Sequence, residues 1–201
     1  DKYHTYDFEM YVSQIGNKLT EQYHNEILKE LTRRFKKISK RKYWSFGEIG
    51  SLIQSIQSGL NQRDDYDYII LFWYLNSLKI AEDSTKVKTF NSMMKSKNEI
   101  ELKLALYLLE SNFTLLRNDF FNLNFNPFDI WDLYSDLYVF LDYKWDDMSE
   151  EERKKTKSNI NIMKIPMISD FYNQACKLDL IKLIGSKYDQ TEYQELAILI
   201  E

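Results

Sequence analysis

The scarcity of proline and glycine constrains the fold of this chain more than any other feature of its sequence. The 201 residues include two prolines, Pro127 and Pro166, and five glycines. These two residue types form most tight turns, and a β-sheet protein needs such a turn after nearly every short strand. The sequence therefore predicts an all-α protein, built as a multi-helix bundle or an irregular helical array of about eight to ten helices.

Hydrophobic periodicity and helix start signals predict where those helices lie. Capping-box patterns occur at Ser45 with Glu48 and at Ser149 with Glu152, and Asn126 before Pro127 has the form of a helix N-cap. An apolar run at 68–75 fits a buried strand as well as a helix, and we prefer a helix because no turn signal follows it. Residues 160–165 are a short extended candidate before Pro166. The expected helices span residues 6–18, 20–41, 46–60, 64–81, 86–96, 99–117, 127–143, 149–157, 168–184 and 190–200.

Length, charge and cysteine content indicate one helical domain over residues 1–201, with a possible subdivision near 118–126. The formal net charge is −4, and 44% of the residues are hydrophobic. Cys176 is the single cysteine, which excludes an internal disulfide and favours a reducing, cytoplasmic location. Its apolar neighbours predict a buried structural thiol. The longest apolar run is far shorter than a membrane-spanning helix requires.

The amino-acid composition and the first residue give two expectations about the origin of the chain. Lys, Asn, Ile, Tyr and Phe are abundant and Ala and Val are scarce, which is typical of an AT-rich genome. We therefore expect an AT-rich bacterium, its phage or a mobile genetic element as the source. Because the chain opens at Asp1, we expect a fragment that lacks an upstream segment, such as a DNA-binding region.

A basic segment at 33–44 is the first candidate binding region. Seven cations near the end of a predicted helix precede two aromatic residues, and such a pattern can neutralise phosphates and stack on unpaired bases. The same segment could dock an acidic protein, and cations at a helix C-terminus are also favoured by the helix dipole alone. The acidic pI of about 5.4 argues against a dedicated nucleic-acid binder. The candidate residues are Arg33, Arg34, Lys36, Lys37, Lys40, Arg41, Lys42, Tyr43 and Trp44.

An acidic and aromatic segment is the second candidate. Asp129, Asp132 and Asp136 are spaced to share one face of a helix and could attract a basic partner or a hard cation. The alternative interpretation is a solvated face opposite an apolar one. Tyrosine and tryptophan are enriched in binding hot spots, so the mixture is more typical of a protein-binding surface. The candidate residues for partner binding are Trp131, Asp132, Tyr134, Asp136, Tyr138 and Trp145.

The sequence contains no pattern typical of a catalytic, cofactor or metal site. His4 and His24 are the only histidines, and no phosphate loop, nucleophile elbow or zinc signature occurs. We therefore expect a non-enzymatic protein-interaction domain, with the partner-sensing or dimerisation part of a regulator as its role, and we expect no cofactor, metal or small-molecule ligand. Its partner would be a protein, including a second copy of the chain. The two alternatives are nucleic-acid binding through residues 33–44 and a metal-assisted hydrolase built from scattered carboxylates such as Asp129, Asp132 and Asp136.

Overall fold

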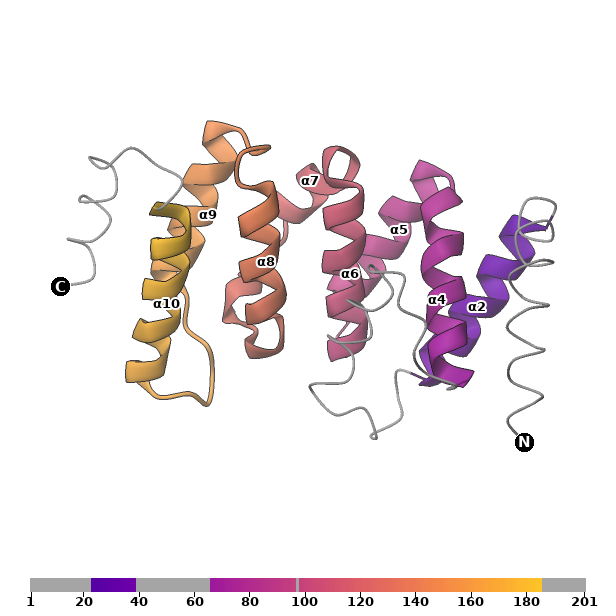
Figure 1. Cartoon of the computed structure of the whole chain (residues 1–201), viewed down its shortest axis with the longest axis horizontal. Coiled ribbons are helices and arrows are strands. Elements are labelled where there is room, and N and C mark those ends of the chain that lie inside the picture. The colour runs from indigo at the N-terminus through magenta and orange to yellow at the C-terminus, as the bar shows by residue number, and fades with distance from the viewer. Residues whose placement is uncertain (1–22, 39–65, 97, 186–201) are drawn as a thin grey trace. The chain divides into compact units, whose positions relative to one another are not determined.

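The computed structural model describes residues 23–38, 66–96 and 98–185, and this part of the chain is all-α (Figure 1). It contains eight α-helices, two short 3-10 turns and no strand. The helices are α2 (His24–Ile38), α4 (Tyr66–Ile80), α5 (Asp83–Met94), α6 (Glu99–Ser111), α7 (Phe113–Phe121), α8 (Tyr134–Lys144), α9 (Glu150–Ile162) and α10 (Asp170–Gly185), and the 3-10 turns are η1 (Pro127–Asp129) and η2 (Trp131–Leu133). The predicted fold class is confirmed. The predicted helices at 6–18, 46–60 and 190–200 lie outside the described residues.

The contacts divide the chain into two units, Asp1–Lys86 and Val87–Glu201. In the first unit α2 packs against α4. Phe35 of α2 is buried and stacks on Tyr74 of α4, with ring centroids 5.0 Å apart. The apolar run at 68–75 belongs to α4, so the predicted choice of helix over strand is confirmed.

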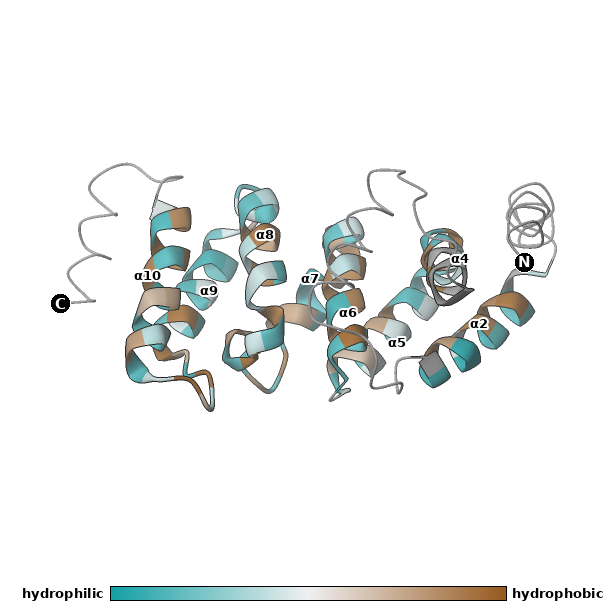
Figure 2. Cartoon of the chain, turned by 60° about the horizontal axis from the view of Figure 1, so that its bottom comes forward, coloured by the Kyte–Doolittle hydropathy of each residue, from teal (hydrophilic) through white to brown (hydrophobic). Residues whose placement is uncertain are grey.

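In the second unit α6, α8 and α10 lie side by side in that order, with α7 and α9 behind them (Figure 1). The central helix, α6, is buried over most of its surface, from Ile100 to Leu109. By contrast α9 is predominantly hydrophilic (Figure 2). Asn91 of α5 donates a hydrogen bond of 2.6 Å to Asp119 of α7, which ties α5 to this unit. Cys176 is buried on α10, as predicted, and burial raises the pKa of its thiol.

Two predicted helices differ from the structure. The single helix expected at 99–117 is wrong, because the chain breaks at Asn112, whose side-chain amide donates to the Leu108 carbonyl where α6 ends. The helix expected from residue 127 is also wrong over its first turns. Asn126 does cap a helical turn at Pro127, but that turn is η1, and the α-helix begins only at Tyr134.

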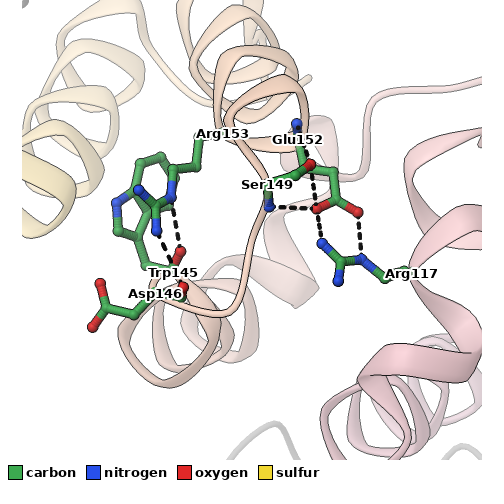
Figure 3. A network of polar contacts seen from close by, with 6 residues as sticks. All are labelled: Arg117, Trp145, Asp146, Ser149, Glu152 and Arg153. Atoms are coloured by element: carbon green, nitrogen blue, oxygen red, sulfur yellow. Dashed lines mark hydrogen bonds and ion pairs between the residues drawn. The ribbon is translucent and has the colours of Figure 1, made fainter.

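The predicted capping box at Ser149 is confirmed and forms part of a larger network between α7 and α9 (Figure 3). The backbone N–H and hydroxyl of Ser149 both donate to Glu152. Arg117 of α7 forms a two-point ion pair with the same carboxylate, and the Nε to Oε1 distance is 2.6 Å. The hydrogen bonds from Arg117 lower the pKa of Glu152 to about 2. Helix α9 then extends to Ile162, so the extended segment expected at 160–165 is helical over its first part.

Candidate protein interaction surface

The residues of the predicted acidic and aromatic segment separate into three environments. Trp131 and Tyr138 are exposed, with 45% and 37% of their surface accessible. Asp132, Tyr134 and Asp136 are half-buried. Trp145 is fully buried in the core, beneath the guanidinium group of Arg153 (Figure 3), so it is not part of the surface that the sequence predicted.

The three aspartates of this segment do not line one helical face. Because η1 and η2 replace the first turns of the expected helix, Asp129 turns toward the α9–α10 connection, where its carboxylate accepts from the Asn126 amide and the Lys164 N–H. Asp136 instead lies against α6. Among the described residues no group of three or more metal-ligating side chains gathers, and the proposed hydrolase site at Asp129, Asp132 and Asp136 is not assembled there.

Asp136 belongs to a cluster around Lys103, a buried lysine of α6. The Lys103 ammonium lies 3.3 Å from a Glu99 carboxylate oxygen and 3.7 Å from one of Asp136. Only 7% of the lysine side chain is exposed, against 24% for Glu99 and 26% for Asp136. Lysine is rarely buried unless it is paired, and here two carboxylates on different helices supply the pairing.

Negative charge exceeds positive charge in this cluster. Burial raises the pKa of Glu99, and repulsion from the carboxylates of Asp132 and Asp136 raises it further, although Lys103 opposes the rise. Burial also raises the pKa of Asp136. Glu99 and Asp136 thus pair with one ammonium group, and the charge of Asp132 acts on Glu99, so a further cation from outside the chain would be attracted to this position.

An aromatic pair lies on either side of Asp132 in the chain, with Trp131 in η2 and Tyr134 at the start of α8. The rings of Trp131 and Tyr134 stack with centroids 6.0 Å apart and an interplanar angle of 11°. The Tyr134 hydroxyl donates to the Cys176 carbonyl of α10, which fixes the position of the pair. Burial is the main reason that the pKa of Tyr134 is raised, so the phenol stays protonated. We use the name acidic-aromatic cluster for Glu99, Trp131, Asp132, Tyr134 and Asp136.

The basic segment is described only in part. Arg33 and Arg34 both bond to Glu30, one turn earlier on α2, at 2.6 Å and 2.8 Å. The hydrogen bonds from these two arginines lower the pKa of Glu30 to about 2. Lys36 and Lys37 are exposed. The remaining predicted residues, Lys40, Arg41, Lys42, Tyr43 and Trp44, lie outside the described residues.

Sequence reasoning missed Glu99 and Lys103 as parts of a site. Lys103 stands alone within an apolar stretch, and that interruption is the one signal that the sequence offers for it. The pairing with Asp136 joins two helices, so no local spacing of residues in the sequence predicts it.

Within the described residues, none of the helices combines the length and the apolar composition that a membrane span requires. Comparison with family models, curated proteins and solved structures found no match for this chain.

Proposed function

We propose that this chain is a non-enzymatic helical interaction domain that binds a basic segment of a partner protein at the acidic-aromatic cluster. The observation that carries the proposal is the exposed Trp131 ring, stacked on Tyr134 and next to Asp132 in the chain, together with two carboxylates, Glu99 and Asp136, that pair with one lysine. A partner arginine or lysine placed there would meet both an aromatic face and excess negative charge.

The buried pairing, besides joining two helices, prepares these residues for binding. Lys103 and its partners are held by α6 and α8, so the carboxylates are ordered before any partner arrives and little side-chain entropy would be lost on binding. Trp131 is held by its stacking on Tyr134 in the same way. Rigid aromatic side chains of this kind are the usual anchors of protein interfaces. Such a surface suits the partner-sensing part of a cytoplasmic regulator.

The proposal is tested with a short fluorescein-labelled peptide of leucine and arginine, titrated with the intact chain at low and physiological salt. Trp131→Ala and Asp132→Asn should each weaken binding about tenfold, since interface anchors typically contribute more than 1 kcal/mol. Binding should also weaken as salt rises, because the attraction is partly between exposed charges.

Matched controls distinguish binding at this surface from non-specific binding to other acidic or aromatic side chains. Tyr143 is another exposed aromatic side chain of α8, and Asp146 is an exposed carboxylate just beyond that helix. Tyr143→Ala and Asp146→Asn should leave the affinity unchanged. Equal losses in the controls, or equal binding of a leucine and glutamate peptide, would show that the acidic-aromatic cluster is not the binding site.

A further inference from the structure

A pocket of about 340 Å³ lies between the α7–η1 connection and α9, apart from the acidic-aromatic cluster. Its walls combine apolar residues, such as Phe121, Phe125 and Ile162, with polar ones, such as Asn124 and Lys155. Ile162 is 68% exposed, so one wall of the pocket reaches the surface. The volume is at the small end of the range of about 300–1,000 Å³ that is typical of small-molecule sites.

The side chain of Asn126 holds the two sides of this pocket together. Its amide donates to the Asn159 carbonyl of α9 at 2.9 Å and to the Asp129 carboxylate at 3.1 Å. Its carbonyl oxygen accepts from the Phe128 N–H, which fixes the turn at Pro127. The pocket is therefore preformed, and a ligand would not have to order its walls.

The polar groups of the pocket favour an anion. Lys155 is the only ionisable residue among those that line it, and within the described part of the chain Lys155 makes no ion pair. The nearby carboxylates already have partners. Asp129 accepts hydrogen bonds from Asn126 and Lys164. Glu152 accepts them from Arg117 and Ser149. The side chains of Asn124 and Asn159 add amide groups that can donate hydrogen bonds.

From these observations we infer that the pocket binds a small carboxylic acid with an aromatic or branched aliphatic group. The apolar group would lie against Phe121, Phe125 and Ile162, and the carboxylate would pair with Lys155. A single ring with a short carboxylate arm is small enough to fit within this volume. This site does not depend on the proposed protein-binding function, and either can fail without the other.

The test uses phenylacetate, indole-3-acetate and 4-methylpentanoate as probes, with phenylacetamide as the neutral counterpart of the first. Binding is measured on the intact chain by calorimetry and by ligand-observed NMR. We expect phenylacetate to bind more tightly than phenylacetamide. Lys155→Gln should weaken phenylacetate binding about fivefold, the upper end for a solvent-exposed ion pair, and should leave phenylacetamide unchanged.

Lys154→Gln is the matched control, because Lys154 is an exposed cation on the same helix that does not line the pocket. Both variants should keep the helical circular dichroism of the wild type. Three results would overturn the inference: no binding of any probe, equal binding of acid and amide, or an equal loss in the two lysine variants. A short acidic peptide that binds there when the free acids do not would also overturn it and would identify a protein-docking pocket instead.

Discussion

Asn173 shows how one side chain can order a whole connection. It is buried on α10, and its amide oxygen accepts from the Ile165 N–H at 2.8 Å while its amide nitrogen donates to the Ile165 and Ser169 carbonyls. These bonds hold the α9–α10 connection, in which Met167 has a φ of 67°, a left-handed conformation that favours glycine. The exposed Met167 side chain makes no compensating contact in the core.

Replacing Asn173 by leucine should therefore destabilise the fold strongly. Leucine has a similar shape but leaves the buried Ile165 N–H and carbonyl without partners, at a cost of about 1–3 kcal/mol for each unsatisfied group. Urea unfolding of Asn173→Leu should show a lower midpoint with an unchanged slope. Gln174→Leu, at the exposed neighbouring position, should change the stability by less than about 0.5 kcal/mol. Similar effects in the two variants would contradict this role for Asn173.

At the scale of elements, the ion pair between α7 and α9 should make stability depend on pH. The pKa of Glu152 is about 2 in the folded protein against an ordinary value of 4.5. A lowered folded pKa means that the stabilisation is complete above 4.5 and is lost as the pH falls toward 2. Glu152→Gln should lower stability at neutral pH by about 1–3 kcal/mol and flatten the pH dependence below 4.5.

Other carboxyl groups with shifted pKa values also affect the pH dependence of stability, so the Glu152→Gln profile is compared with that of the wild type. Glu30 also has a pKa of about 2 and adds acid sensitivity of the same sign. Burial raises the pKa of Glu99 and of Asp136, so protonation of these two groups favours the fold and acts in the opposite direction. Glu151→Gln removes an exposed carboxylate beside Glu152 and should leave the wild-type pH profile unchanged. An unchanged profile for Glu152→Gln would refute the assignment.

The Lys103 cluster joins α6 to α8 and gives a second prediction at this scale. Lys103→Met leaves Glu99 and Asp136 partly buried without their cation, which typically costs about 3–5 kcal/mol. The loss should shrink as the pH falls, because the two carboxyl groups become neutral at their raised pKa values. Adding Asp136→Asn to Lys103→Met should restore part of the stability in thermal unfolding. Additive losses in the double variant would mean that the two side chains do not interact.

At the scale of the whole molecule, composition predicted the fold class and local patterns predicted several helix starts. The capping box at Ser149 and the cap at Asn126 depend only on neighbouring residues, and both are present. The sequence did not predict the break between α6 and α7 at Asn112, because apolar periodicity continues on both sides of that residue. Trp131 and Tyr138 were expected at the surface and are exposed there, whereas Trp145 is buried and Lys103 was overlooked. Both differences arise from packing between helices, which no local pattern encodes.

The division into two units permits a test of the single-domain prediction. The second unit begins within α5 at Val87, so a fragment from Glu82 to Glu201 keeps that helix and the hydrogen bonds that Glu82 accepts at its start. On the order of 100 residues is typical of an independent domain. We expect this fragment to be helical and to unfold cooperatively in urea, at a midpoint that matches one phase of the intact chain. A fragment that begins at Val87 loses the first turn of α5 and should be less stable. The contrary result is a fragment with no cooperative transition while the intact chain has a single one. The whole chain then folds as a single domain, because the second unit has too little buried surface to be stable without the first.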